Sequence, residues 1–151
     1  MEFVMKSLFV AAVLSVSASL ASAEIIKVAS PYSVDETLDR LEQVVAGAGA
    51  KVFARVEHAK GAAKIGEELA PMALLVFGKP QLGTPALQAN PLAGLVLPAR
   101  VLGYQDSDGA VWLAYENPAD MLAPFDIPAD AKVVVQLTKA LGGLTGKAVA
   151  K

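Results

Sequence analysis

The pattern of apolar and polar residues is most regular between residues 33 and 49. Ser33, with Glu36 three residues later, forms a capping-box pattern, and Gly47 and Gly49 are typical of a helix end. Between these signals the apolar side chains recur at helical spacing: Val34, Leu38, Leu41, Val44, Val45 and Ala48. The sequence therefore predicts an amphipathic helix that begins after Ser33.

Two short segments on either side of this helix have the pattern of strands. Residues 24–30 are rich in β-branched side chains, and residues 51–57 alternate between apolar and polar positions. The alternation predicts that Val52, Ala54 and Val56 share one buried face.

Three more strands are predicted further along the chain. The continuous apolar run at residues 73–77 is typical of a central strand. Residues 99–105 and 110–116 flank Asp106-Ser107-Asp108-Gly109, which is a strong hairpin signal because glycine readily adopts positive φ.

Four further segments have helical features. Residues 58–69 are alanine-rich, although Gly61 and Gly66 weaken a helix by about 1 kcal/mol each relative to alanine. Thr84-Pro85 has the pattern of an N-cap followed by a proline at the first helical position, which predicts a short helix from there to Ala89.

The remaining two helices lie near the C-terminus. Asn117-Pro118 repeats the cap-and-proline pattern and predicts a short helical turn. A last helix is expected from about Ala129, because Val134, Leu137, Leu141 and Leu144 follow helical spacing. The resulting order of elements predicts an α+β fold, in which helices pack on a mostly antiparallel sheet.

The N-terminus has the features of an export signal. Lys6 precedes a 14-residue uncharged stretch, residues 7–20, and Ala21-Ser22-Ala23 forms an A-x-A cleavage pattern. We expect residues 1–23 to be a signal peptide and residues 24–151 to be a single domain that is periplasmic or secreted. A retained membrane anchor is the alternative, although the stretch is shorter than the roughly 20 residues of a spanning helix.

Acidic Glu2 is unusual in the basic first part of a signal peptide, so translation is expected to start at Met5.

Composition and charge narrow the range of functions. The chain has no cysteine, so its stability must come from packing and not from disulfides. Its formal net charge of −2 argues against a nucleic-acid partner, which would need a basic face.

Several ordered motifs resemble one known family. They are the HAKGAAKIG segment at residues 58–66, FGKPQLGTP at 77–85, Leu97-Pro98, and the DGAVWLAY hairpin at 108–115. Together they are similar to the domain-of-unknown-function 302 family over about residues 25–148. One departure is Lys79, where asparagine is common in relatives. The resemblance implies a single copy of a TATA-binding-protein-like fold that forms homodimers, and it transfers no catalytic residue.

Three residues are candidates for binding. His58, the only histidine, stands beside Glu57, and an imidazole is the side chain that most often serves as a general acid or base. Lys79 precedes the helix predicted to begin at Thr84, and a helix N-terminus attracts anions. Alternatively, His58 caps a helix, and the segment around Lys79 is a loop shaped for packing.

Other chemistry is poorly supported. One histidine and no cysteine disfavour a metal site, and Asp106-Ser107-Asp108-Gly109 lacks the later ligands of a calcium loop. Gly142–Lys147 departs from a phosphate-binding loop at its first glycine and after its lysine, and no serine lies in a nucleophile elbow. No cofactor is expected.

The sequence therefore predicts a non-catalytic binding or interaction module that acts as a homodimer and takes a small or apolar ligand. The alternative is an enzyme that uses His58 as a general acid or base. A purely structural role for the dimer is a further alternative.

Overall fold

The computed structural model describes residues 22–151, so nearly all of the predicted signal peptide, with Met1 and Met5, lies outside the described residues. The described part contains five strands and five α-helices, with 3₁₀ turns at Pro91–Leu95 and Ala123–Phe125. In chain order the strands and α-helices are β1 (Ile25–Ser30), α1 (Val34–Gly47), β2 (Lys51–Val56), α2 (His58–Lys64), β3 (Met72–Gly78), α3 (Pro80–Ala89), β4 (Ala99–Gln105), β5 (Val111–Glu116), α4 (Pro118–Leu122) and α5 (Lys132–Val149).

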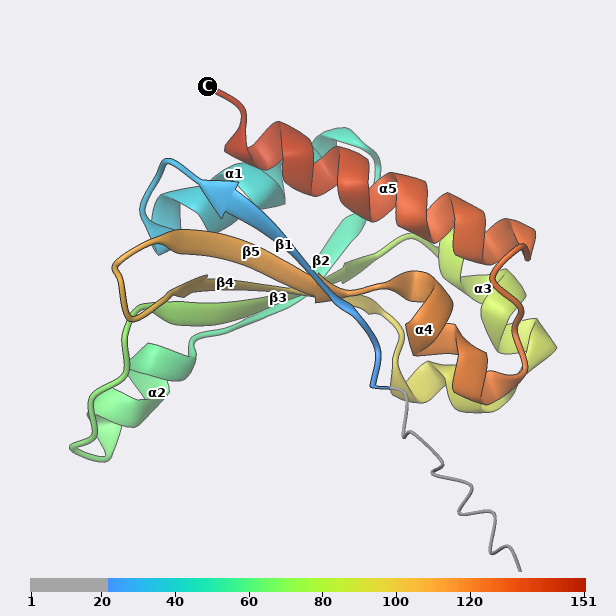
Figure 1. The fold of residues 1–151 in the computed structure, drawn as a ribbon, viewed down its shortest axis with the longest axis horizontal. Coiled ribbons are helices and arrows are strands. Elements are labelled where there is room, and N and C mark those ends of the chain that lie inside the picture. Colours follow the sequence, from blue (N-terminus) through green and yellow to red (C-terminus); the bar gives the residue numbers. More distant parts are fainter. Residues whose placement is uncertain (1–21) are drawn as a thin grey trace, which may run out of the picture.

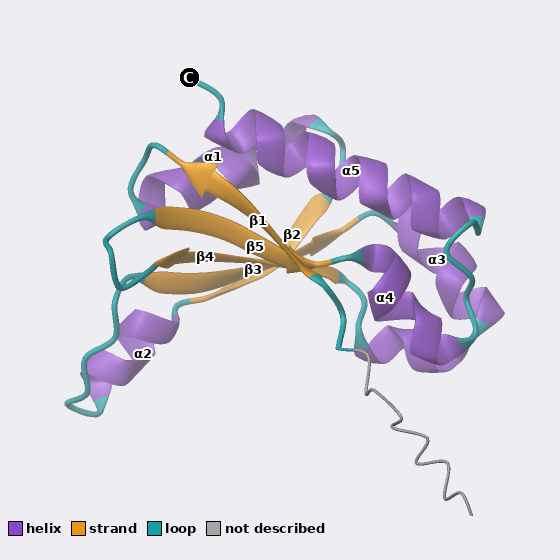
Figure 2. Ribbon diagram, in the orientation of Figure 1, coloured by secondary structure: helices purple, strands orange, loops and turns teal. Residues whose placement is uncertain are grey.

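The five strands form one sheet in the order β1-β5-β4-β3-β2, and every neighbouring pair is antiparallel. The β1–α1–β2 connection carries the chain from one edge of the sheet to the other. Helices α1 and α5 lie side by side over one face of the sheet (Figures 1 and 2). The predicted α+β fold with a mostly antiparallel sheet is confirmed.

The main core lies between α1, α5 and the covered face of the sheet. On β3, Ala73, Leu75 and Phe77 are buried, whereas the residues between them are only half-buried. Leu38 and Leu41 of α1 are completely buried against this face. The alternation along β3 shows that only one face of the sheet is covered by helices.

A close approach in the middle of the sheet sets the position of α1. Gly103 of β4 faces Leu38, and a Cβ atom added at Gly103 would lie only 2.8 Å from the Leu38 Cγ. Only glycine gives α1 this distance from the sheet, because Leu38 is fully buried and protein interiors are closely packed.

A second, smaller core lies beyond the end of the sheet. The N-terminal half of α5 packs there against α3, α4 and the 3₁₀ turns, as Figure 1 shows on the right. Its buried residues are Ala86, Ala93, Met121, Leu122, Ile127, Val133, Val134 and Leu137. Among the elements of the described part, only helix α5 therefore contributes to both cores.

The hairpin and two helix caps form as the sequence predicts. The β4–β5 hairpin turns at Gly109, which has a φ of 81°. The Ser33 hydroxyl accepts a hydrogen bond from the Glu36 N–H at 3.2 Å, and the side-chain Oδ1 of Asn117 accepts one from the Ala119 N–H at 3.0 Å. Each of these features depends only on residues close in sequence, so it can be predicted without the tertiary structure.

The predicted face of β2 is wrong beyond its second residue. The register of β2 with β3 shifts between Val52 and Ala54, which makes Phe53 a bulge. The bulge reverses the alternation, so that Ala54 and Val56 are exposed and Arg55 turns towards α1 instead.

Three helix boundaries also differ from the prediction. Helix α3 begins at Pro80, so Thr84 lies inside it and is not its N-cap, and Pro85 is an internal proline. Helix α2 ends at Lys64 and not near residue 69, and α5 begins at Lys132 and not near residue 129. In α3 the turn signal of Thr84-Pro85 is overridden because Pro80 already stands at the first helical position.

We predict that Gly103→Ala lowers the free energy of unfolding by about 1–3 kcal/mol, because the added methyl group overpacks the Leu38 contact. Urea unfolding followed by circular dichroism measures the change. The control is Gly146→Ala in α5, where an added Cβ meets nothing within 4 Å and helix propensity should raise stability by about 0.5–1 kcal/mol. Equal stability of Gly103→Ala and the wild type would contradict the close packing of α1 on β4.

Candidate functional site

A cavity of about 830 Å³ lies between the two cores, where α5 passes over the end of the sheet. Its walls come from the β3–α3 junction, the segment leading into β4, the bulge of β2 and the middle of α5. The volume is in the range of sites that bind small molecules.

Most of the lining is apolar. Leu82 and Leu87 of α3 line the cavity together with Leu137 and Leu144 of α5. Phe53, the bulged residue of β2, also lines it and is 52% exposed. An apolar surface of this extent that is open to water favours the binding of an apolar group.

The charged residues of the lining all have the same sign. They are Lys79, Lys139 and Lys147, and among residues 22–151 no aspartate or glutamate lines the cavity. The Lys79 ammonium group donates a long hydrogen bond of 3.4 Å to the Ala48 carbonyl at the end of α1. Within residues 22–151 none of the three lysines forms an ion pair.

The stripe of α5 that faces the cavity has a gap between two lysines. Lys139, Gly143 and Lys147 are spaced four residues apart, so they lie along one side of the helix. A Cβ atom added at Gly143 would meet nothing within 4 Å. The glycine therefore leaves the cavity wall open between the two ammonium groups.

Two of the three residues singled out from the sequence lie together at this cavity. Lys79 and Thr84 both line it, although Thr84 caps no helix. The lysines of α5 were not predicted as site residues. Lys147 belongs to the glycine-rich segment that departs from a phosphate-binding loop, and the structure places that segment inside α5.

His58 lies outside the cavity. It is the exposed first residue of α2, and no hydrogen bond or ion pair of its side chain is found within residues 22–151. Neighbouring Glu57 is engaged elsewhere: its carboxylate lies 3.1 Å from the Lys60 ammonium and 3.1 Å from Nε of Arg55. His58 and Glu57 thus do not form an acid–base pair in this structure.

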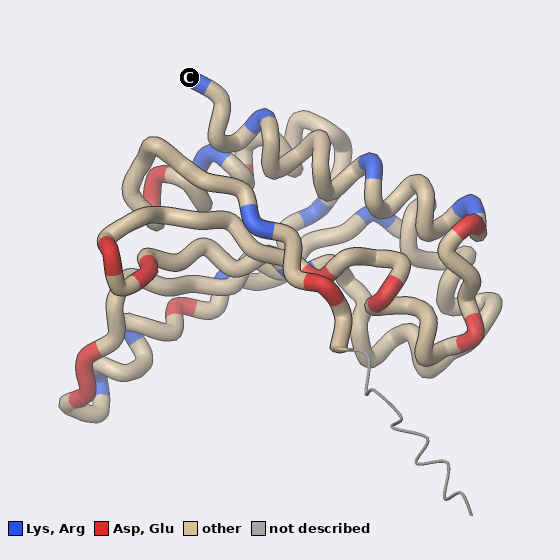
Figure 3. Tube along the Cα trace, viewed as in Figure 1, with Lys and Arg blue, Asp and Glu red and all other residues tan. Residues whose placement is uncertain are grey.

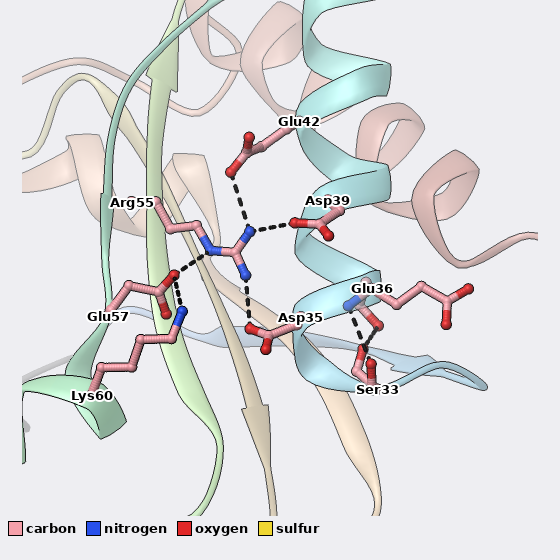
Figure 4. A network of polar contacts seen from close by, with 9 residues as sticks. Ser33, Asp35, Glu36, Asp39, Glu42, Arg55, Glu57 and Lys60 are labelled. Atoms are coloured by element: carbon pink, nitrogen blue, oxygen red, sulfur yellow. Dashed lines mark hydrogen bonds and ion pairs between the residues drawn. The ribbon is translucent and has the colours of Figure 1, made fainter. Parts of the chain in front are cut away.

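The acidic stripe of α1 surrounds a single arginine (Figure 4). Arg55 contacts Asp39 at 2.6 Å, Asp35 at 2.9 Å and Glu42 at 3.4 Å. Its contact with Glu57 is an ion pair without hydrogen-bond geometry. Among the described residues no group of histidines, aspartates and glutamates has an arrangement that could hold a metal ion. These carboxylates therefore fix α1 to β2.

The β4–β5 turn holds a second polar cluster, which lies on the open side of the sheet. The Asp106 carboxylate accepts hydrogen bonds from the Trp112 indole at 2.8 Å and from the N–H groups of Asp108 and Ala110. The Lys27 ammonium lies 5.5 Å from the centre of the Tyr104 ring. The Trp112 hydrogen bond is the main cause that lowers the pKa of Asp106 below its ordinary value; desolvation opposes it, and the N–H groups of Ala110 and Asp108 add to the lowering.

Comparison with known families matches residues 26–144 to DUF302, "Domain of unknown function DUF302". The match spans most of the chain, and the chain therefore belongs to this family.

Three curated proteins are similar to part of the chain. The "Fluoride-specific ion channel FluC 1" of Brucella suis biovar 1 (strain 1330) is 40% identical over 102 residues, which cover 68% of this chain and 40% of that protein. "Fluoride-specific ion channel FluC 2" of Brucella melitensis biotype 1 has the same identity, and the match covers 38% of it. The chain thus spans about two fifths of the length of these relatives.

One solved structure has the same fold. It is titled "Crystal structure of uncharacterized conserved protein DUF302 from Bacillus stearothermophilus", and it superposes with a TM-score of 0.74 at 22% identity. The superposition covers 82% of this chain and 97% of that one. Across residues 22–151, the helices are all too short or too polar to cross a membrane.

We predict that Asp106→Asn destabilises the fold at pH 7 and that this difference shrinks at pH 3. A carboxyl group whose pKa is lowered by folding stabilises the folded state above its unfolded pKa, near the ordinary value of 3.8. That stabilisation is lost as the pH falls through the folded pKa. Urea unfolding at the two pH values measures it, with Asp108→Asn as a control in the same turn. A difference that does not change with pH would rule out the charged hydrogen bond to Trp112.

Proposed function

We propose that this member of the DUF302 family is a non-catalytic binding module that holds a small apolar ligand in the cavity between α3 and α5. The observation that supports the proposal is the apolar lining of this cavity, which is large enough for a small molecule and open to solvent. A fold that used this surface only for packing would bury Leu82, Leu87 and Leu144 more completely.

The chemistry of the lining favours binding over catalysis. The polar side chains of the cavity are lysines, glutamines and Thr84, without the carboxylate or imidazole that a general acid or base requires. The alternative function, an enzyme that uses His58, would place its substrate at α2, away from this cavity.

The relatives with channel names support a role as an attached module. In those proteins the matched segment is less than half of the chain. We infer that this fold works beside other proteins, and that in this chain the predicted signal peptide, residues 1–23, delivers it to the periplasm or the outside of the cell.

The module acts as a homodimer through the open face of its sheet. Figure 2 shows α1 and α5 on one side of the sheet and no helix over the middle of the other side. The register places Leu74, Leu102 and Ala114 next to one another across the middle of this open face. Nearby, Arg100 pairs with Glu116 at 3.1 Å. A face with an apolar centre and charges of both signs is complementary to a second copy of itself under twofold symmetry.

We predict that the wild type binds the neutral fluorescent probe N-phenyl-1-naphthylamine and that Gly143→Leu weakens this binding at least tenfold. The leucine projects into the cavity from a position where an added Cβ meets no atom within 4 Å, so the helix should tolerate it. Fluorescence titration measures the affinity. Gly146→Leu is the matched control, since it lies on the same helix, is equally free of contacts and is outside the cavity. Equal affinity of Gly143→Leu and Gly146→Leu would place the ligand elsewhere.

We predict that the exported wild-type protein has, by native mass spectrometry, twice the mass of a chain that begins at Glu24. Leu102→Lys should reduce it to the monomer, because the new charge lies in the apolar centre of the open face. The control is Leu92→Lys at a position outside the sheet that is 60% exposed. A monomeric wild type, or a Leu102→Lys variant that stays dimeric and folded, would disprove dimerisation through this face.

A further inference from the structure

The charged side chains around the cavity indicate the charge of the ligand, in addition to the apolar character that the lining indicates. The chain as a whole has a formal net charge of −2, yet the three charged side chains of the cavity are all lysines. They come from two walls: Lys79 from the β3–α3 junction, and Lys139 and Lys147 from α5.

We propose that the cavity binds an amphipathic anion, a single apolar chain with a terminal carboxylate, whose head group pairs with Lys79, Lys139 and Lys147. The apolar chain lies against Leu82 and Leu144. This inference rests on the proposed function, since it names the chemical class of the ligand in the same cavity.

The surroundings of the α5 lysines support an anionic ligand. Helix α5 contains three lysines and no carboxylate, and Figure 3 shows basic segments along its length. The positions three and four residues away from Lys139 are Val135, Gln136, Gly142 and Gly143, so none of them can pair with its charge. Lys147 sits in the last turn, where it also interacts favourably with the helix dipole, but Lys139 has no such explanation.

The spacing of the charges also favours an anion between them. Lys139 and Lys147 are two turns apart, about 12 Å along the helix axis. The wall between them is Gly143, which carries no side chain. A carboxylate in this gap would relieve the repulsion between the two ammonium groups and accept charge-assisted hydrogen bonds from lysine.

The carboxylates nearest in sequence to Ala48 and Phe53 of the cavity lining are Glu42 and Glu57, and both form ion pairs with Arg55. Asp35 and Asp39 of α1 contact the same guanidinium group (Figure 4). An arriving carboxylate therefore meets no like charge in the lining.

The test compares three ligands with the same ten-carbon chain and different head groups: decanoate, decanol and decyltrimethylammonium. Each displaces N-phenyl-1-naphthylamine from the full mature chain at pH 7.5, and its dissociation constant is measured in low and high salt. Decanoate should bind at least tenfold more tightly than decanol, and the cationic ligand should bind most weakly. High salt should reduce the preference for decanoate, because it screens the lysine charges.

The variant Lys79→Gln/Lys139→Gln/Lys147→Gln should bind decanoate no more tightly than decanol while its affinity for decanol is unchanged. The control, Lys64→Gln/Lys132→Gln/Lys151→Gln, changes the net charge equally at lysines outside the cavity and should keep the preference. Circular dichroism checks that both variants are folded, and the three single variants replace the triple one if it is not.

The outcomes separate this inference from the proposed function. If decanol binds and decanoate binds no better, the anionic ligand is wrong and the apolar site stands. A preference lost equally in both triple variants would also overturn the inference, since it would reflect net charge alone. If neither the fluorescent probe nor any ten-carbon ligand binds the wild type, the proposed function fails and this inference fails with it.

Discussion

The contact between Leu38 of α1 and Gly103 of β4 is the constraint on which the rest of the structure depends. The β1–α1–β2 connection crosses the whole sheet, so α1 must lie on one face, and Gly103 allows it to lie close to that face. With α1 at this distance, α5 can pack beside it over β1 and complete the main core. None of the helices within residues 22–151 lies over the middle of the other face, which leaves Leu74 and Leu102 only half-buried.

The length of α5 then creates the cavity. Its C-terminal half covers the sheet with α1, whereas its N-terminal half packs against α3 and α4 beyond the sheet's end. A single straight element joins two cores, and the side chains between them are too small to fill the space. Ala140 and Gly143 on α5, together with Gly78 at the end of β3, line that space. The cavity is thus a consequence of two cores sharing one helix.

Sequence patterns within a few neighbouring residues predicted most of the helices and strands. The features that were not predicted depend on contacts between residues far apart in the sequence or on competing local patterns. The periodicity of α1, the cap at Ser33 and the turn at Gly109 were correct because each depends on neighbours within a few residues. The face of β2 was wrong because one bulged residue, Phe53, reverses the alternation after it. The start of α3 was wrong because Thr84-Pro85 and Pro80 both have the pattern of a helix start. Of the residues that line the cavity, the sequence singled out Lys79 and Thr84, whereas only the fold brings Lys139 and Lys147 to the same cavity from a distant part of the chain.

The positions of the cavity and the open face allow both proposed activities in one molecule. The cavity lies on the covered side of the sheet, between α5 and α3, whereas Leu102 and Ala114 belong to the opposite side. A second copy that docked on the open face would therefore leave the lysines around the cavity in solvent. The ligand cavity and the dimer surface then use opposite faces of the same sheet. Strand β3 contributes to both faces: Phe77 lines the cavity, and Leu74 and Val76 face the other way. A homodimer of this kind would present two cavities on its two outer sides, each free to take its own ligand.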